Sequence, residues 1–378
     1  MSAARTSFFA TCAPGLEPLL FAEVRALKLP RAEQQTGGVY FEGTLADAAR
    51  ANLWLRTAVR VLMRLVRFQA ATGDELHRGA QTVDWSRFLD PQASFVVAAH
   101  ASESALDHTL FVEQRVKDAI CDQFREKTGQ RPSVDKEAPD LGVHVHLFRD
   151  RCSLLVDTSG ESLHKRGWRR FQGRAPLAET LAAALVLDSG WDRRAPLVDP
   201  FCGSGTLLVE AAWLALGIAP GSRRKQFAFE RWKEWDPALG RKLRAEAAAA
   251  PKRGGKLILR GVESDAATLA GARENLESAG VAEFVELERG RAEEFEYKRG
   301  WNAWIASNLP YGERIGDERE LAPVLRRFGA RLAERCAGWH ATLLSGNPKL
   351  TQALGLAIAR RRAVQNGAIP CEMLHVEL

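Results

Sequence analysis

The sequence predicts an α/β protein with a doubly wound parallel sheet in its C-terminal half. Three observations lead to this fold class. The chain has 378 residues, more than a single core usually supports, so two or three domains are expected. Beyond about residue 176, apolar strand patterns alternate with helix patterns, which is typical of a parallel sheet covered by helices. Before residue 160, the strands lie in shorter units that include a pair joined by a tight turn.

Residues 1–65 predict one small α/β unit. Its expected elements are strands at 7–12, 37–43 and 60–68 and helices at 15–28 and 44–56. Pro14, Glu17 and Glu23 interrupt the apolar run near the N-terminus, and the leucines of this run fall on one helical face. We therefore expect a strand, a turn and an amphipathic helix here, and no export signal.

Residues 66–160 predict a second unit. A strand at 94–101 precedes a helix at 111–129, and Gly129 is a suitable helix end. Strands at 143–150 and 151–159 alternate well and meet at the polar turn Arg-Asp-Arg. A charged linker at 161–175 then leads into the last part of the chain.

Residues 176–378 form the expected third domain. Its strands are predicted at 195–202, 256–263, 284–290 and 303–310, with helices between them. Residues 245–256 predict a helix end followed by a loop. In such open sheets, ligands bind along the edge where the strands end, and this edge is therefore the expected place for a functional site.

Composition excludes several classes of protein. Charged residues make up 26% and hydrophobic residues 46%, as in ordinary globular proteins, and the net charge of +6 permits a polyanionic partner. None of the six cysteines forms a CxxC pair, which argues against a zinc knuckle or a disulfide framework and suits a reducing cytoplasm. No apolar run approaches the roughly 18 residues of a membrane span. His144 and His146 share a strand face without a third ligand nearby, so no metal site is expected.

The stretch VDPFCGSGT places a glycine-rich turn between a strand and a long helix. Gly203 and Gly205 allow a ligand to approach the backbone, and the helix start behind Thr206 offers free N–H groups. A nucleoside triphosphate would require a lysine that is absent, and a dinucleotide would require a third glycine where Leu208 stands. S-adenosylmethionine (SAM) is the third class of ligand, since its carboxylate end suits such a turn. A tight turn without a ligand is the alternative.

The next strand ends in an acidic residue. Glu263 is placed so that its carboxylate can accept hydrogen bonds from two ribose hydroxyls, and Ser264 and Asp265 follow it. Asp265 also suits the N-cap of the following helix.

The stretch SNLPYG ends a later strand at the same edge of the sheet. The side-chain oxygen of Asn308 and the carbonyl of Leu309 can accept the hydrogens of an exocyclic amine and free its lone pair for attack on a methyl sulfonium. Pro310 restricts Leu309 to extended backbone, Tyr311 can stack on a flipped base, and Gly312 allows close approach. A proline-containing loop with a packed tyrosine is the alternative.

The linker contains the basic stretch HKRGWRR. Its cations and aromatic ring predict phosphate contact and base stacking by Lys165, Arg166, Trp168, Arg169 and Arg170. A solvated linker is the alternative.

The sequence resembles a known family over nearly its whole length. The motifs that carry the resemblance are DTSGESLHKRGWR, APLAETLAAALV, PLVDPFCGSGTLLVEAA, FAFERW, NLPYG with GERIG, and QNGAIPCEML. They look like the bacterial THUMP-containing, class I SAM-dependent rRNA guanine-N2 methyltransferases of the RlmL type. The resemblance implies a ferredoxin-like segment at 1–65, an RNA-binding THUMP domain at 66–160 and a Rossmann-like methyltransferase domain at 176–378.

Site roles follow from the resemblance by position. Residues Asp199, Pro200, Phe201, Cys202, Gly203, Gly205 and Thr206 would surround SAM, with Glu263, Ser264 and Asp265 near its ribose. Asn308 to Tyr311 would hold the guanine amine. Arg291 stands where such enzymes place an aspartate near the adenine, so this contact would fall to the backbone at Ala292 or to Glu293. Some members carry a further domain that makes 7-methylguanine, for which this sequence has no room.

The expected activity is methyl transfer from SAM to the N2 amine of a guanine in structured RNA, with 23S rRNA as the substrate, in the cytoplasm. Neither a membrane nor a metal ion is expected to take part. Three alternatives stay open: a tRNA guanine-N2 methyltransferase, a DNA adenine amino-methyltransferase, and a non-catalytic RNA-binding or ribosome-assembly protein.

Overall fold

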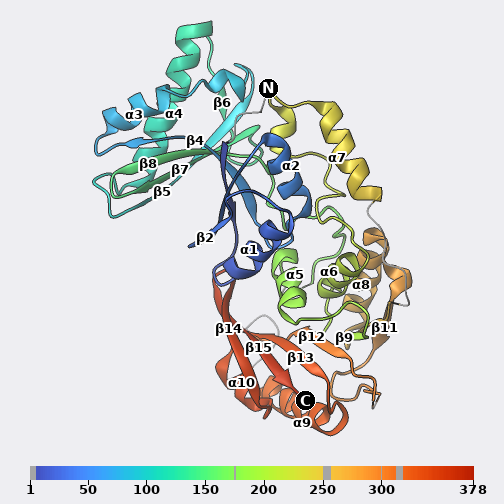
Figure 1. Ribbon diagram of the computed structural model, residues 1–378. Coiled ribbons are helices and arrows are strands. Elements are labelled where there is room, and N and C mark those ends of the chain that lie inside the picture. Colours follow the sequence, from blue (N-terminus) through green and yellow to red (C-terminus); the bar gives the residue numbers. More distant parts are fainter. Residues whose placement is uncertain (1–5, 174–175, 250–256, 299, 312–317) are drawn as a thin grey trace. The chain divides into compact units, whose positions relative to one another are not determined.

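A computed structural model describes residues 6–173, 176–249, 257–298, 300–311 and 318–378 (Figure 1). Its contacts divide the chain into two compact units. Unit 1 comprises Met1–Thr11, Glu23–Leu163 and Arg224–Ala245, and unit 2 comprises Cys12–Ala22, His164–Arg223 and Glu246–Leu378.

Unit 1 contains a mixed sheet with eight described strands, in the order β2-β3-β1-β4-β8-β7-β5-β6. The strands are β1 (Thr6–Thr11), β2 (Glu33–Gln35), β3 (Gly38–Gly43), β4 (Arg60–Gln69), β5 (Ser94–Ser102), β6 (Ser133–Val134), β7 (Leu141–Phe148) and β8 (Arg151–Asp157). The helices are α2 (Leu45–Trp54), α3 (Gly73–Gln81), α4 (Thr109–Thr128) and, shared with unit 2, α1 (Glu17–Ala26).

The predicted elements of this half are present. Gly129 ends α4 in the left-handed conformation and donates its N–H to the carbonyl of Arg125. Arg149 and Asp150 both have positive φ, as a two-residue hairpin turn between β7 and β8 requires. Strand β4 runs across residue 65 and joins both segments into one sheet, so the expected boundary between the first two domains stays a prediction.

Unit 2 contains a second sheet of seven described strands, in the order β11-β10-β9-β12-β13-β15-β14. The strands are β9 (Leu197–Asp199), β10 (Leu259–Glu263), β11 (Val285–Arg289), β12 (Trp304–Asn308), β13 (His340–Ser345), β14 (Ile358–Asn366) and β15 (Ile369–Glu377). The first five strands in this order run parallel to one another. Strand β15 runs antiparallel to both of its neighbours, β13 and β14.

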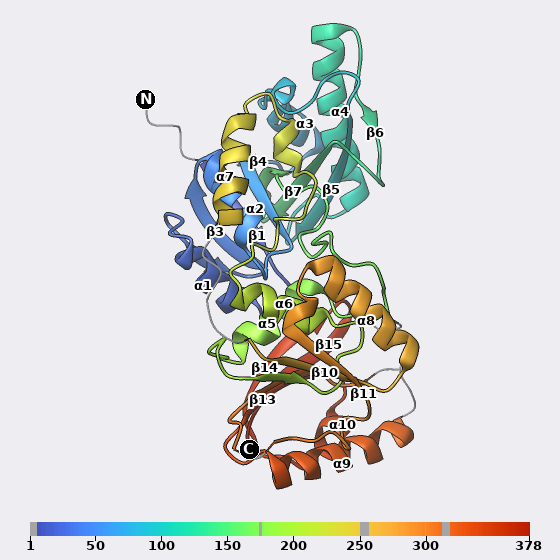
Figure 2. The same ribbon diagram turned by 90° about the vertical axis from the view of Figure 1, so that its right-hand side faces the viewer.

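Helices cover both faces of this second sheet. They are α5 (Glu179–Asp188), α6 (Thr206–Ala215), α8 (Ala266–Ala279), α9 (Glu318–Arg335) and α10 (Pro348–Ala353). Helices α5, α6 and α8 lie on one face and α9 and α10 on the other, and Figure 2 shows the same arrangement from a second side. The doubly wound prediction is confirmed, with the addition of the parallel strand β13 and of the antiparallel hairpin β14–β15, which the sequence pattern did not indicate. Strand β14 is exposed along most of its length and therefore lacks an apolar signal.

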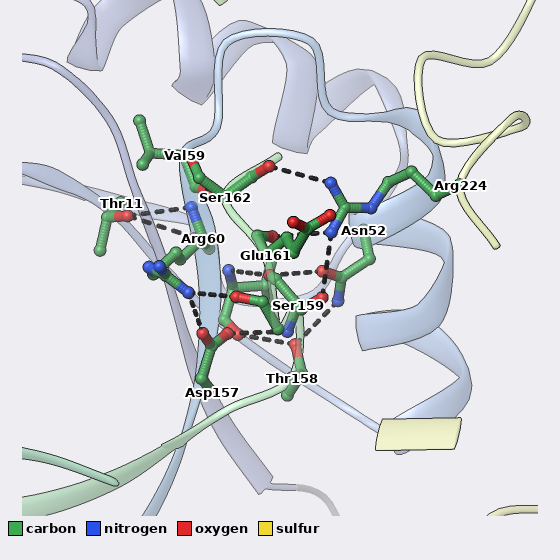
Figure 3. A network of polar contacts seen from close by, with 12 residues as sticks. Thr11, Asn52, Val59, Arg60, Asp157, Thr158, Ser159, Glu161, Ser162 and Arg224 are labelled. Carbon is green, nitrogen blue, oxygen red and sulfur yellow. Dashed lines mark hydrogen bonds and ion pairs between the residues drawn. The ribbon is translucent and has the colours of Figure 1, made fainter. Parts of the chain in front are cut away.

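A segment from the second half of the sequence packs within unit 1. Residues Arg224–Ala245 include most of α7 (Pro237–Ala249). The buried Arg224 donates to the carbonyls of Ser159, Glu161 and Ser162 at 3.3, 2.7 and 2.9 Å (Figure 3). Its guanidinium therefore pairs the chain just beyond β8 with a segment about sixty residues later in the sequence.

The same stretch beyond β8 is tied to α2. The side-chain amide of Asn52 donates to the Thr158 hydroxyl at 2.8 Å and accepts from the Ser159 hydroxyl at 2.6 Å (Figure 3). These three side chains are buried, so each hydrogen bond satisfies a group that water cannot reach.

Candidate cofactor pocket and catalytic loop

A pocket of about 460 Å³ lies at the ends of strands β9, β10, β11 and β12 in unit 2. Nine of the predicted site residues line it: Pro200, Phe201, Gly203, Glu263, Ser264, Ala292, Asn308, Leu309 and Pro310. Segments far apart in the sequence meet here because parallel strands carry their C-terminal ends to one edge of the sheet.

The glycine-rich turn forms one wall of the pocket. Gly203 and Gly205 have φ of 53° and 77°, a region that a side chain would disfavour. Gly205 is the N-cap of α6 and provides no side-chain cap, so the first N–H groups of the helix lack that partner. Cys202, Gly205 and Thr206 do not line the pocket. Cys202 and Thr206 are buried, and the Thr206 hydroxyl accepts a hydrogen bond from Arg169 at 3.0 Å.

Asp199 lies beneath this turn and not in the pocket. Its carboxylate accepts hydrogen bonds from the Ser307 hydroxyl at 2.6 Å and from the Phe201 N–H at 3.3 Å. Burial raises the pKa of Asp199 to about 7, partly opposed by these hydrogen bonds. The side chain therefore connects the end of β9 to β12 and supports the turn from below.

The two acidic residues at the end of β10, Glu263 and Asp265, have different roles. Glu263 is half-buried, lines the pocket and accepts the Asp265 N–H at 2.8 Å. Asp265 does not line the pocket and caps α8, accepting the Thr268 N–H at 2.8 Å. Of the two roles weighed for Asp265, the structure shows the helix cap.

Arg291, which stands where the resembling enzymes place an aspartate, lies at the end of the pocket beyond β11. Arg291 and Glu293 both line the pocket together with Ala292. The Glu293 side chain is only 6% exposed and forms an ion pair with Arg327 at 2.9 Å. Its carboxylate is therefore held in place next to the Ala292 backbone, and its role toward the adenine stays a prediction.

Asn308 presents an unsatisfied polar atom at the pocket. Its Oδ1 is inaccessible to water and has no hydrogen-bond partner among the described residues. The following N–H, of Leu309, is held by the carbonyl of Leu344 at 3.0 Å. Asn308 itself lines the pocket, so its side-chain amide is a candidate partner for a group bound there.

Tyr311 does not line the pocket. Its ring is buried and packs so closely on Gly346 that a side chain there would collide with it. Its hydroxyl accepts hydrogen bonds from Asn366 at 3.0 Å and Cys371 at 3.5 Å. Stacking of this ring on a base is therefore wrong for the described conformation, because the ring is enclosed by the β14–β15 hairpin. Gly312 and the rest of GERIG lie outside the described residues.

The basic stretch is mostly built into unit 2. Trp168 is fully buried, and the buried Arg166 forms an ion pair with Glu210 of α6 at 3.2 Å. Arg169 pairs with Glu179 at 2.8 Å. RNA contact is therefore wrong for Trp168 and Arg166, since burial removes both side chains from the surface. Lys165 and Arg170 are exposed.

Asn275 of α8 was not identified from the sequence and holds this stretch against the glycine-rich turn. Its Oδ1 accepts the N–H groups of Arg170 and Phe171 at 2.7 and 2.9 Å. Its Nδ2 donates to the carbonyls of Phe171 and Ser204 at 2.9 and 3.0 Å. An asparagine inside a helix pattern, where it is intrinsically unfavourable, was the only available signal. We call residues 166–173 the belt; its last residue, Gly173, lines the pocket.

The strand order of unit 2, with its pocket at the ends of the parallel strands, defines a methyltransferase domain of the Rossmann-like class I type. Comparison with protein families identifies which one. A family model described as the RMKL-like methyltransferase domain matches residues 166–375, more than half of the chain, and the chain belongs to this family. Models of the RlmL ferredoxin-like domain and the THUMP domain match residues 7–62 and 70–157.

Individual relatives support the same assignment. The chain is 42% identical to the ribosomal RNA large subunit methyltransferase K/L of Pseudomonas paraeruginosa and 44% identical to that of Methylococcus capsulatus, over 98% and 97% of its length. It spans about half the length of these curated relatives (52% and 50%).

Solved structures resemble the chain from end to end. A proposed methyltransferase complexed with SAH superposes with a TM-score of 0.88 at 31% identity and covers 100% of this chain and 99% of its own. A predicted N6-adenine-specific DNA methylase from Listeria monocytogenes has the same TM-score and identity and covers 99% and 96%.

Proposed function

We propose that the protein is a SAM-dependent RNA methyltransferase that modifies the exocyclic N2 amine of a guanine in large-subunit rRNA. The observation that carries this proposal is the orphaned Oδ1 of Asn308 at the pocket. An amine hydrogen of the substrate base is the donor that this oxygen lacks.

The residues around the pocket fit SAM. The glycine-rich turn at Gly203 offers close backbone approach, and Glu263 offers a carboxylate for the ribose hydroxyls. The Ala292 backbone and the fixed Glu293 carboxylate are the candidates for the adenine. When bound, SAM supplies the electrophilic methyl group.

The chain's own residues orient the nucleophile. The Asn308 oxygen and the Leu309 carbonyl accept the two hydrogens of the amine and direct its lone pair. No strong base is required beforehand, because the nitrogen becomes acidic as it gains the methyl group and then releases a proton. Oriented acceptors stabilise the positive charge that develops on the nitrogen.

The proposal that the substrate is RNA rests on the similarity of the chain to its relatives. The curated relatives are named for large-subunit rRNA, and the THUMP match gives the chain a module of the kind that the family resemblance associates with RNA. One structural relative is instead named for DNA adenine, so DNA stays a second candidate, beside tRNA. The six cysteines are buried and form no disulfide, which is consistent with a cytoplasmic location.

The test supplies labelled SAM and purified protein with unmodified large-subunit rRNA, tRNA or genomic DNA. Products are digested to nucleosides and identified by mass. N2-methylguanosine from rRNA is the expected result, and N2-methylguanosine from tRNA would keep the mechanism and change the substrate. Methyladenine in DNA, or no transfer to any of the three, would overturn the proposal.

A further inference from the structure

One face of the sheet in unit 1 carries exposed side chains toward one end of strands β4, β8, β7 and β5, near the turn between β7 and β8. Alternate residues of a strand point to opposite faces. On the face where α4 packs against β5, side chains such as Phe95, Val145 and Leu154 are buried. On the other face, the strands carry exposed residues: Arg67 of β4, Arg151 of β8, His146 and Phe148 of β7, and His100 of β5.

The strand register makes these exposed residues neighbours. His100 is the partner of His146 between β5 and β7, and Phe148 is the partner of Arg151 between β7 and β8. Arg67 and His146 both pair with Ser153 from opposite sides. The exposed side chains therefore form one continuous surface across four strands, about 14 Å wide at the usual strand spacing.

Three guanidinium groups gather on this surface. Arg64 and Arg67 come from β4 and Arg151 from β8, and none of them forms an ion pair with a described residue. Partial burial, followed by the charges of Arg64 and Arg151, lowers the pKa of Arg67. Crowding of like charges costs stability, which an anionic ligand would offset.

Acidic residues are nearly absent from the part of this face that the four strands form. Beyond it, Glu42 of β3 lies on the same face as Arg64 and is paired with Arg31. Within these four strands, which the structure describes completely, the one acidic side chain on this face is Asp157, which is buried and paired with Arg60. At the rim, Glu103 is paired with Arg149 at 2.8 Å. The surface is therefore complementary to a polyanion.

Flat rings accompany the arginines. Phe148 is 40% exposed, and the guanidinium carbon of Arg149 lies 4.9 Å from its ring centroid. The rings of His100 and His146 stack at 5.8 Å with an interplanar angle of 16°. Exposed rings of this kind bind the faces of unpaired bases, which a duplex keeps hidden.

We propose that this open face, defined by Arg64, Arg67, Arg151, Phe148 and the His100–His146 pair, binds a single-stranded segment of the RNA substrate. The arginines contact phosphates while the rings stack on bases. The inference rests on the proposed function, because it assigns a surface to the RNA that the methyltransferase domain modifies.

The test uses the full chain and a labelled single-stranded RNA dodecamer of mixed sequence, with the duplex of the same sequence as comparison. Arg67→Glu/Arg151→Glu should weaken single-strand binding and lower the slope of log affinity against log salt by about 0.7 for each phosphate that the variant no longer neutralises. Phe148→Ala should weaken binding by roughly tenfold, since one base loses its stacking partner.

A matched control reverses two charges elsewhere in unit 1. Arg125→Glu/Lys127→Glu changes exposed residues in the last turn of α4, on the helical side of the sheet, and should leave single-strand affinity close to wild type. SAM affinity and the unfolding midpoint of every variant verify that it is folded.

Two results would overturn the inference: wild-type affinity and salt slope in Arg67→Glu/Arg151→Glu, or an equal loss in the control pair. Tighter binding of the duplex than of the single strand would also overturn it. If any of these results occurs while rRNA is still methylated, the surface assignment fails and the proposed function stands. If the wild type methylates no RNA, the proposed function itself fails.

Discussion

The proposed methyl transfer depends strongly on one atom, the side-chain oxygen of Asn308. Asn308→Ala removes the orphaned acceptor without disturbing the Leu309–Leu344 backbone hydrogen bond. Turnover should fall by roughly 100- to 1,000-fold, the range seen when one group that stabilises developing charge is removed. SAM affinity should stay the same, because the turn at Gly203 and the carboxylate of Glu263 are intact. Single-turnover rates with rRNA and calorimetric SAM binding measure both, and wild-type turnover would refute the role.

Asp199 makes the stability of the protein depend on pH. Burial raises its pKa from 3.8 to about 7. A carboxyl with a raised folded-state pKa contributes stability that is complete below about pH 4 and is lost as the pH rises through about 7. Asp199→Asn cannot ionise, so its free energy of unfolding should increase relative to wild type over this window, by at most about 1.4 kcal/mol per pH unit. Urea unfolding at pH 5 and pH 8 measures the difference, and parallel pH profiles would contradict the assignment.

At the scale of elements, the belt and helix α8 together hold the glycine-rich turn. Asn275→Ala leaves several buried backbone groups without partners and should lower the free energy of unfolding by at least about 2 kcal/mol. It should also weaken SAM binding, because the Ser204 carbonyl loses its donor. Ser278→Ala removes only the exposed contact with Arg170 and should change stability by less than about 0.5 kcal/mol. Full SAM affinity in folded Asn275→Ala would contradict this role, because it would show that the glycine-rich turn keeps its conformation without Asn275.

The loop after β12 is anchored by the C-terminal hairpin. Tyr311→Phe keeps the ring and removes the hydroxyl that binds Asn366 and Cys371. It should lower stability by about 1 kcal/mol and reduce kcat more than it changes KM for SAM. Asn366→Ala should act through the same contact, so a double-mutant cycle should show strong non-additivity. If the ring instead stacked on a base, Tyr311→Phe would keep full turnover and the cycle would be additive.

At the scale of the whole molecule, the chain passes between its units several times. Arg224 belongs to unit 1, although residues His164–Arg223, which directly precede it in the sequence, belong to unit 2. Arg224→Ala should lose about 2–4 kcal/mol of local stability, since three carbonyls lose a charged donor. Hydrogen exchange should rise around residues 157–163 and stay unchanged in β9–β13. Lys225→Ala, an exposed neighbour, is the control, and equal protection in both variants would contradict this role for Arg224.

Much of the fold followed from local pattern. The strands and helices predicted for the first half, and the parallel strands β9 to β12 of the second half, appear where the periodicity placed them. Helix α3, the short strands β2 and β6, and the parallel strand β13 were not predicted. Strand β14 was not predicted, because an exposed edge strand carries no apolar alternation. Nine of the predicted site residues reached the pocket, because a strand end directs its residues to the same edge in every doubly wound sheet.

The sequence by itself determined the α/β class, the glycine-rich turn, the acidic strand end and the Asn-Leu-Pro-Tyr loop, since each of these is a local feature with its own backbone requirement. Tertiary structure decided which of those side chains face the pocket. It buried Asp199 beneath the turn, enclosed Tyr311 in the hairpin and turned Arg166 and Trp168 inward. Such choices depend on partners distant in sequence, such as Ser307, Asn366 and Glu210, and only packing brings those partners into contact.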